Sequence, residues 1–367
     1  MLFYFLYPLK NTFFAFNVFN YISFRATGAA ITALLISFFL GPKIIRTLEF
    51  YQIGETIRKH GPKSHLKKEG TPTMGGIIVL LAIILPTILW AKLDNKYILL
   101  ILASTIWMGL IGFMDDYLKV VKKYPSGLIA KYKLIGQILL SITIAYFVIQ
   151  YPAIQEYSNS TSIPFIANGM IDITWFYPLL IIIVITGTSN AVNITDGLDG
   201  LATGLVAIST LVFAAIAYAT GRLDYSNYLN IIYLPNTGEL FIFCLSMIGA
   251  CIGFLWFNAN PAKVFMGDTG SLAIGAALGT LAVLVKKEIL LILIGGVFVV
   301  ESISVILQVY YFKYTKNKFG KGKKLFLMAP LHHHFELSGW HENHVVVRFW
   351  IIGVLLALIS LTTFKIQ

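Results

Sequence analysis

Two adjacent carboxylates close an apolar segment near the first third of the chain. The stretch WMGLIGFMDDYLK (residues 107–119) is apolar for eight residues and then places Asp115 beside Asp116. Carboxylates at the C-terminal end of a helix oppose the helix dipole, and the lysines that follow are predicted to offer only solvated pairing. Two adjacent acids can hold a divalent cation, because hard cations prefer oxygen ligands, or can supply a base beside it. The pair indicates phosphate chemistry, with a plain helix end in the headgroup region as the structural alternative.

Amides and carboxylates recur in a second motif, NAVNITDGLDG (residues 190–200). On a continuous helix a row at every third position drifts around the axis, and the two glycines favour a break, so a short polar loop is predicted. Such groups suit the edge of a nucleobase and ribose hydroxyls. A helix cap is the alternative, with the second carboxylate accepting N–H groups of the next helix. The four residues are Asn190, Asn193, Asp196 and Asp199.

Two further motifs place possible caps in front of apolar windows. In FNANPAKVFMGDTGS (residues 257–271), Asp268 comes one residue before the window, where Asp is a common N-cap. A helix N-terminus also attracts phosphate through its free N–H groups. In KKEGTPTMGG (residues 67–76), Thr73 is likewise predicted as an N-cap, and two glycines follow where helices or a substrate approach closely. Both motifs leave capping and function open.

Three consecutive histidines lie in APLHHHFELSGWHE (residues 329–342). The side chains of His332, His333 and His334 cannot all face one way on a helix or strand, so a tridentate metal site is geometrically awkward. Donation to phosphate from one or two of them is favoured, since imidazole can fill that role near neutral pH. Glu301 is predicted to lie well inside a membrane span, where an ionisable residue is a functional candidate or a buried carboxyl paired to a neighbouring helix.

The amino-acid composition indicates that the elements carrying these motifs lie in a membrane. With 57% hydrophobic and 12% charged residues, the chain is far more apolar than a soluble domain. Windows of roughly 18–25 apolar residues, the length that a hydrocarbon core requires, predict an all-α polytopic membrane protein with about ten spanning helices. They lie near residues 24–48, 73–91, 97–114, 133–151, 174–190, 201–219, 238–257, 269–285, 289–312 and 345–363. We interpret residues 1–23 as an interfacial segment and residues 1–367 as a single integral-membrane domain.

Charge placement predicts the orientation of this bundle. The loops near residues 41–72, 115–133, 191–200, 258–268 and 313–344 carry 19 of the 28 Lys and Arg residues. By the positive-inside rule these loops are cytoplasmic and both termini face the periplasm. The basic loops could meet anionic headgroups or an anionic substrate, whereas short loops between spans do not favour nucleic acid. All five motifs then fall on the cytoplasmic side, which predicts one active site at the inner membrane surface.

Taken together, the motifs resemble those of a known family. The segments TPTMGG, GFMDDYLKV, NAVNITDGLDGLA, NANPAKVFMGDTGSLA and PLHHHFELSGWHE, in this order, are similar to phospho-N-acetylmuramoyl-pentapeptide-transferase, the MraY family of bacterial membrane enzymes. The resemblance covers nearly the whole chain, and the histidine run is its most specific part. The wider superfamily of polyprenyl-phosphate sugar-1-phosphate transferases shares the aspartate motifs, but it does not generally combine TPTMGG with PLHHHFE.

The resemblance implies a reaction and its participants. Phospho-N-acetylmuramoyl-pentapeptide would pass from the UDP-linked donor to undecaprenyl phosphate in the bacterial cytoplasmic (inner) membrane, giving lipid I and UMP. This is the first membrane step of peptidoglycan synthesis, and Mg²⁺ is the expected cofactor. Phosphoryl transfer needs charge neutralisation and positioning more than covalent help. The resemblance also allows a homodimer.

The resemblance further implies roles for individual residues. The expected catalytic residues are Asp115, Asp116, Asp268 and His333, with Asp268 as first choice for Mg²⁺ and the acid pair for the lipid phosphate or as further metal ligands. The expected substrate contacts are Lys68, Thr73, Lys119, Lys133, Asn190, Asn193, Asp196, Asp199, Phe265, His332, His334 and Glu301.

The sequence leaves two alternative functions open. A related polyprenyl-phosphate transferase would move a different N-acetylhexosamine-1-phosphate. A transporter would place its carboxylates at mid-bilayer on broken helices, whereas here only Glu301 is so placed.

Overall fold

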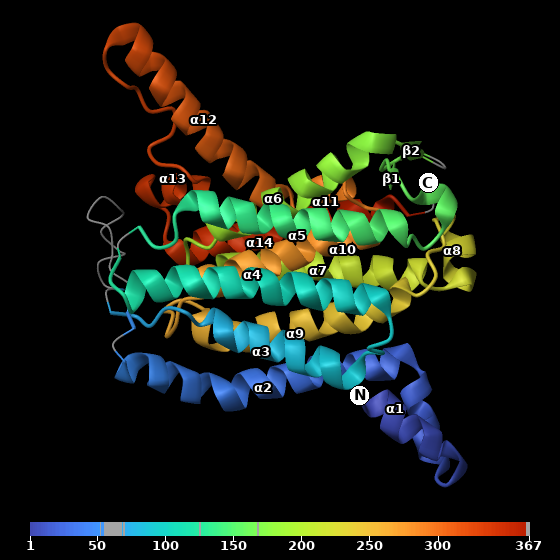
Figure 1. Ribbon diagram of the computed structural model, residues 1–367. Coiled ribbons are helices and arrows are strands. Elements are labelled where there is room, and N and C mark those ends of the chain that lie inside the picture. The colour runs from blue at the N-terminus through green and yellow to red at the C-terminus, as the bar shows by residue number, and fades with distance from the viewer. Residues whose placement is uncertain (52, 55–67, 69, 125, 167–168, 365–367) are drawn as a thin grey trace.

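The chain forms a bundle of long helices that run side by side (Figure 1). The computed structural model describes residues 1–51, 53, 54, 68, 70–124, 126–166 and 169–364. Nine helices of this described part are long and apolar enough to cross a membrane: α2 (Ile22–Phe50), α4 (Lys96–Val120), α5 (Ala130–Gln150), α6 (Tyr177–Thr195), α7 (Leu201–Thr220), α9 (Leu240–Asn258), α10 (Gly267–Leu284), α12 (Gly296–Phe319) and α14 (Glu342–Thr362). A shorter apolar helix, α3 (Gly76–Trp90), joins them. The prediction of an all-α polytopic membrane protein is confirmed.

Helices dominate because a lipid environment leaves each backbone N–H and C=O group to be satisfied within its own segment. The remaining elements are short and lie at the ends of the bundle or in its connections. They are α1 (Leu2–Leu6), η1 (Tyr7–Asn11), η2 (Phe14–Asn20), η4 (Gln155–Tyr157), β1 (Ser160–Ser162), β2 (Met170–Asp172), η5 (Thr174–Phe176), α8 (Leu223–Leu229), η6 (Thr237–Glu239), α11 (Leu290–Ile294) and α13 (Leu331–Leu337). The strands β1 and β2 pair as an antiparallel hairpin in which Thr161 lies opposite Ile171.

Helix α10 forms the centre of the bundle. It packs against α4, α6 and α3, and nearly all of its side chains are buried. Its sequence GDTGSLAIGAALGTLAVL is rich in small residues, which let neighbouring backbones approach closely as in other membrane helices. The central position of α10 brings its first turn into contact with the ends of several other helices.

Several predicted boundaries are wrong, and the corrections matter for the site. The predicted ninth window, residues 289–312, is divided into α11 and α12 at Gly295, and α12 continues to Phe319. Helix α4 continues to Val120 and α6 to Thr195. Polar side chains in the last turns of both helices find partners on neighbouring helices, so hydropathy alone places the helix ends too early.

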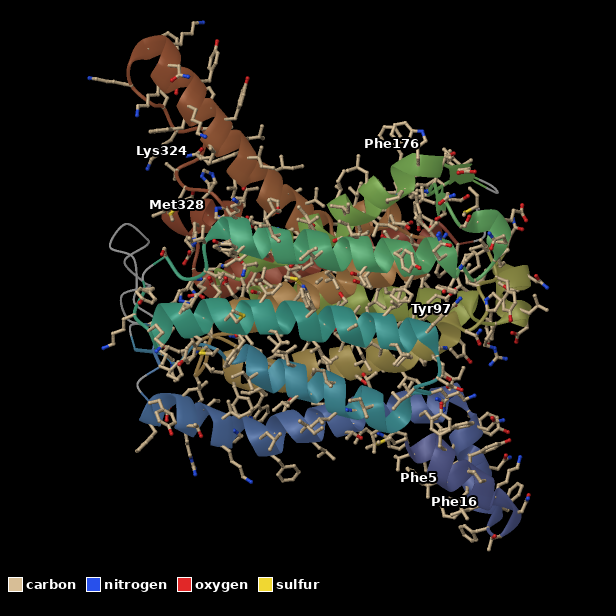
Figure 2. All side chains as sticks on the ribbon, in the orientation of Figure 1. Phe5, Phe16, Tyr97, Phe176, Lys324 and Met328 are labelled. Carbon is tan, nitrogen blue, oxygen red and sulfur yellow. The ribbon has the colours of Figure 1, made fainter. Side chains whose placement is uncertain are left out.

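The two ends of the bundle carry different residues. In Figure 2, Tyr97 at the start of α4 lies at one end, and Met328 just before α13 lies at the other. The amino group of Met1 donates to the carbonyls of Ile88 and Leu89 in α3, at 2.9 and 3.0 Å, so the N-terminal segment lies at the Tyr97 end. The predicted sidedness, with both termini outward, and the interfacial role of residues 1–23 stay predictions. Of the predicted loops, residues 52, 55–67, 69 and 125 lie outside the described residues.

Candidate functional site

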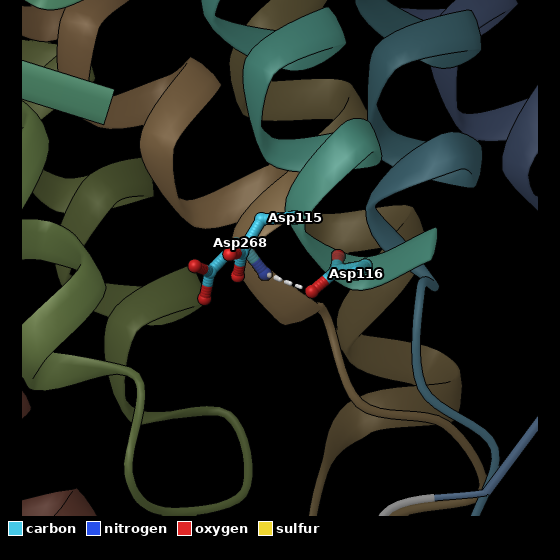
Figure 3. A group of neighbouring side chains, drawn as sticks. All are labelled: Asp115, Asp116 and Asp268. Atoms are coloured by element: carbon cyan, nitrogen blue, oxygen red, sulfur yellow. Dashed lines mark hydrogen bonds between the residues drawn. The ribbon is translucent and has the colours of Figure 1, made fainter. Parts of the chain in front are cut away.

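Three carboxylates meet where α4 ends and α10 begins (Figure 3). One oxygen from each of Asp115, Asp116 and Asp268 lies within 4.8 Å of the others. Asp268 is the second residue of α10, and the N-cap of this helix is Met266. The alternative in which Asp268 is the N-cap is therefore wrong. The cap is supplied from another helix: Asp116 accepts hydrogen bonds from the Asp268 and Thr269 N–H groups, at 3.1 and 2.8 Å, and from the Thr269 hydroxyl at 2.6 Å.

Two lysines partly neutralise this acid cluster. The Lys133 Nζ atom lies 2.9 Å from Asp115 Oδ2 and 2.5 Å from Asp268 Oδ2. Lys119 forms an ion pair with Asp115 and lies 3.3 Å from Asp268 Oδ2. The expectation that the lysines after Asp116 pair only in solvent is therefore wrong for Lys119, because its partner Asp115 is fully buried. Three carboxylates and two ammonium groups leave a formal charge of −1, which a divalent cation can complement.

Close backbone approach at two glycines makes this junction possible. A Cβ atom on Gly112 of α4 would lie 2.1 Å from the Asp268 carbonyl oxygen, and one on Gly76 would lie 2.1 Å from the backbone nitrogen of Gly270. Any larger residue would push α4 or α3 away from the first turn of α10. These two glycines therefore allow α3, α4 and α10 to converge at the acid cluster.

The TPTMGG segment pairs with the loop before α10. The N–H groups of Gly75 and Gly76 donate to the carbonyls of Phe265 and Met266, each at 2.8 Å. Thr73 does not cap α3, because the N-cap is Gly75; instead its buried hydroxyl lies beside the α-carbon of Gly267, next to Asp116. The predicted cap is wrong, and the assignment of Thr73 to the phosphate chemistry stays a prediction.

The two asparagines of the second motif lie on a helix and not in a loop. Both are in the last turns of α6, which ends at Thr195. Asn193 Nδ2 donates to Asp268 Oδ1 at 3.0 Å and to Ser271 Oγ at 2.8 Å, so Asn193 belongs to the acid cluster. Asn190 Nδ2 donates to the carboxamide oxygen of Gln137 on α5 at 2.9 Å. The helix does break within this motif as predicted, but the break begins only at Asp196, the C-cap of α6.

A second charged cluster joins loops that are distant in sequence. Asp199 Oδ1 lies 2.7 Å from Lys68 Nζ, and Glu342 Oε1 lies 2.6 Å from the same Nζ atom and accepts the Asp199 N–H at 3.0 Å. The other Asp199 oxygen accepts from Asn260 Nδ2 and from the Ala262 N–H, each at 3.0 Å. The alternative in which Asp199 caps α7 is wrong, since α7 has Gly200 at its N-cap without a side-chain cap.

The histidine run forms α13, and its side chains diverge as expected. The His332 ring is fully buried, with Nδ1 3.4 Å from Glu301 Oε1. His333 Nδ1 lies 2.9 Å from Glu336 Oε2, and His334 Nδ1 accepts the Leu327 N–H at 3.2 Å. The three rings thus meet three different partners.

Glu301 connects α12 to this histidine helix. Its two oxygens accept the N–H groups of Leu331 at 2.7 Å and His332 at 3.1 Å, so Glu301 caps α13. Glu301 is the predicted buried carboxyl, but its partners are backbone donors of a loop helix and not a neighbouring span. His332 also packs on the polar loop after α6, because a Cβ on Gly197 would lie 2.3 Å from its Nε2 atom.

Known proteins share these motifs along the full chain. A phospho-N-acetylmuramoyl-pentapeptide-transferase from Desulfotalea psychrophila is 51% identical over 367 residues, covering 100% of both chains. Another from Thermodesulfovibrio yellowstonii is 50% identical with the same coverage, and one from Chlorobaculum parvum is 47% identical over 369 aligned residues. The chain belongs to the phospho-N-acetylmuramoyl-pentapeptide-transferase family. The resemblance predicted from the motifs is confirmed.

The segments matched by family descriptions carry most of the site. The first signature of phospho-N-acetylmuramoyl-pentapeptide-transferase matches residues 68–80, which hold Lys68, Thr73 and the start of α3. The broader description, glycosyl transferase family 4, matches residues 98–286, from α4 through α10. The acid cluster lies within this second match, whereas the histidine helix lies outside both.

The structure also shows two polar residues that the sequence did not single out. Glu342 and Gln137 were not assigned roles, yet Glu342 holds Lys68 beside Asp199 and Gln137 holds Asn190. The sequence held a signal for each: Glu342 ends the quoted histidine motif, and Gln137 interrupts an apolar window.

The predicted site residue Phe265 is half-buried, and its backbone pairs with Pro72 and Gly75.

Proposed function

We propose that this protein transfers phospho-N-acetylmuramoyl-pentapeptide from its UDP-linked donor to undecaprenyl phosphate in the bacterial cytoplasmic membrane, releasing UMP and forming lipid I. The observation that carries the proposal is the cluster of Asp115, Asp116 and Asp268 with Lys119 and Lys133 at one end of a membrane bundle. Acids for a metal and lysines for phosphate oxygens are what phosphoryl transfer requires. The relatives named above carry this activity in their names.

The acid cluster fits Mg²⁺, which is the cofactor that we propose. Hard cations take carboxylate oxygens, and Asp115 and Asp268 each direct an oxygen to the same pair of lysines. When bound there, Mg²⁺ would neutralise charge on the diphosphate of the donor. We assign Asp115 and Asp268 as its holders.

The other charged groups of this cluster have different tasks. Asp116 orders the first turn of α10, because both its oxygens already accept hydrogen bonds from that turn. Lys119 and Lys133 would bind phosphate oxygens, and the partly exposed Lys119, paired with the buried Asp115, is where the lipid phosphate would approach.

We assign recognition of the donor to the second cluster and the histidine helix. Lys68, Asp196 and Asp199 with Phe265 would contact the uridine, while His333 and His334 would contact the diphosphate or the sugar. His332 is too deeply buried for direct contact and would hold the loop after α6 through Gly197. Asn193 donates to Asp268, so we move it from the uridine group to the metal group.

Incubation of purified protein with UDP-N-acetylmuramoyl-pentapeptide, undecaprenyl phosphate and Mg²⁺ tests the proposal through UMP release. We expect UMP and a lipid-linked product, both lost on addition of a chelator. A parallel reaction with UDP-N-acetylglucosamine tests the related transferase, and turnover of this second donor alone would overturn our assignment. The homodimer allowed by the resemblance stays a prediction, to be tested by the mass of the protein in detergent.

A further inference from the structure

Helix α12 leaves the bundle and ends in a strongly basic segment. Figure 1 shows α12 diverging from the other helices, and Figure 2 places Lys324 far from the bundle axis, toward the same end as Met328. Between Glu301 and Glu336 the sequence has no acidic residue but has six lysines. We name residues 313–327 the basic hook. Its exposed lysines are Lys313, Lys316, Lys318, Lys321, Lys323 and Lys324.

The basic hook is a built structure and not a loose tail. Helix α12 ends at Phe319, and its C-cap, Gly320, takes a left-handed conformation with φ of 71° and reverses the chain. On the return path, the Lys323 N–H donates to Thr315 Oγ1 at 2.8 Å. Gln308 Oε1 accepts the N–H groups of Leu325 and Phe326, at 3.0 and 2.9 Å. The lysines are therefore held on a fixed scaffold.

Along α12, an exposed apolar stretch is followed by a basic stretch. The part nearer the bundle exposes Ile306, Val309 and Tyr310 at 66%, 48% and 69% of their surface. The lysines begin only after these residues, and exposed aromatic side chains such as Tyr314 and Phe319 lie among them. Apolar residues followed by aromatic and basic residues are the order found from the hydrocarbon core to the headgroups of a membrane.

No carboxylate in the described part of the chain pairs with the six lysines. Two of them contact aromatic residues instead: Lys318 lies 3.3 Å from the Tyr314 hydroxyl, and Lys323 lies 5.4 Å from the Phe319 ring centroid. The hook projects sideways from the bundle (Figure 1), which would place these charges over the lipid beside the protein. An excess of positive charge at that level is complementary to anionic headgroups.

We propose that the basic hook is a docking surface for anionic phospholipid headgroups of the leaflet that faces the acid cluster. This contact holds the outer half of α12 at the membrane surface. The hook is also connected to the candidate site, since Leu327 donates to His334 and Glu301 on α12 caps α13. Headgroup binding therefore restricts the movement of α13, the histidine helix.

A fluorescent reporter on the hook tests this docking without reference to enzyme activity. The exposed Asn317 is replaced in Asn317→Cys and labelled with an environment-sensitive dye; Cys244 and Cys251 are fully buried and do not compete. The protein is placed in nanodiscs of phosphatidylcholine alone or mixed with phosphatidylglycerol. We expect a blue-shifted, quencher-protected dye only with phosphatidylglycerol, and reversal at high salt, where the screening length falls to about 3 Å.

Two charge variants in the same Cys background distinguish an effect of the hook from an effect of the overall charge of the protein. The hook variant replaces Lys318, Lys321, Lys323 and Lys324 by Gln; each lysine favours the bound position by about fivefold, so the phosphatidylglycerol response should be lost. The matched control replaces four exposed cations on α2 and after α4 by Gln and should keep the response. These are Lys43, Arg46, Lys122 and Lys123.

The outcomes decide the proposal directly. An unmodified hook whose dye responds equally to both lipid mixtures would overturn it, as would a response that survives in the hook variant or disappears equally in the control. Unfolding temperatures in detergent show whether each variant is folded. Because the dye reports position and not turnover, failure here leaves the proposed transferase activity untouched, and the reverse also holds.

Discussion

The Lys133 ammonium group lies 2.5 Å from a carboxylate oxygen of Asp268, and this pair joins α5 to the first turn of α10. The same ammonium group contacts Asp115 at 2.9 Å. Lys133 therefore already supplies positive charge to the oxygens that we assign to Mg²⁺. A metal and an ammonium group compete for these oxygens, so metal binding is favoured when a diphosphate offers the lysine a new partner.

Lys133→Met should strengthen metal binding in the absence of substrate. Removal of the competing charge is expected to raise the affinity for Mn²⁺, used as a spectroscopic substitute for Mg²⁺, by roughly tenfold or more. Titration of free Mn²⁺ by electron paramagnetic resonance measures this change. Turnover should fall in the same variant, because a phosphate contact is lost. Lys131→Met is the control, since Lys131 is exposed on the same helix; unchanged Mn²⁺ affinity in Lys133→Met would contradict the competition.

Asp268→Asn should abolish turnover while the protein stays folded. Asparagine keeps the size of the side chain and can still accept from Asn193, but it removes the charge that we assign to the metal. Loss of metal charge stabilisation predicts a fall in Mg²⁺-dependent UMP release by roughly a hundredfold or more. Asp94→Asn is the control, because Asp94 bonds to Tyr4 at the opposite end of the bundle. Near-normal turnover with unchanged Mg²⁺ dependence would remove Asp268 from the metal site.

Lys68→Met should destabilise the protein and weaken donor binding together. It leaves Asp199 and Glu342 as neighbouring buried carboxylates without their shared cation. Removal of one partner from a buried ion pair costs roughly 3–5 kcal/mol, and the partial exposure of Lys68 places the expected loss of unfolding free energy at the lower end. Denaturant unfolding in detergent and a UDP-donor binding assay measure the two effects.

The double variant Lys68→Met with Glu342→Gln isolates the charge contribution. One of the two unpaired charges is then gone, while the amide oxygen can still accept the Asp199 N–H. We expect stability to recover partly and donor binding to remain weak. A double variant no more stable than Lys68→Met would show that packing of the lysine stem, and not charge balance, holds the cluster.

Cysteine labelling in intact cells should show on which side of the membrane the acid cluster lies. A cysteine at Glu156, which is exposed in η4, should react with an impermeant reagent from outside, whereas one at Asn317 should react only after the membrane is opened. The reason is the excess of lysine in the loops at the hook end. The reverse labelling pattern would place the candidate site on the periplasmic face.

Sequence alone determined the class of fold and the chemistry of the site. Apolar windows long enough to span a bilayer leave the backbone only helices in lipid, so the bundle followed directly from hydropathy. Paired carboxylates and histidines pointed to phosphate chemistry, and amides beside carboxylates pointed to a nucleoside, because these side chains carry the needed oxygens and donors. The motif order was specific enough to identify the family, which the relatives confirm.

Tertiary structure decided which partner each polar residue has. Asp116 caps a helix more than 150 residues away in sequence, and Asn193 turns from the expected nucleoside group to Asp268. Glu301 caps α13, and Glu342 completes the Lys68 cluster. Local patterns cannot show these pairings, because hydropathy and capping rules describe a segment by itself, whereas the partner of a buried charge depends on which distant helix end packing brings within about 3 Å of it.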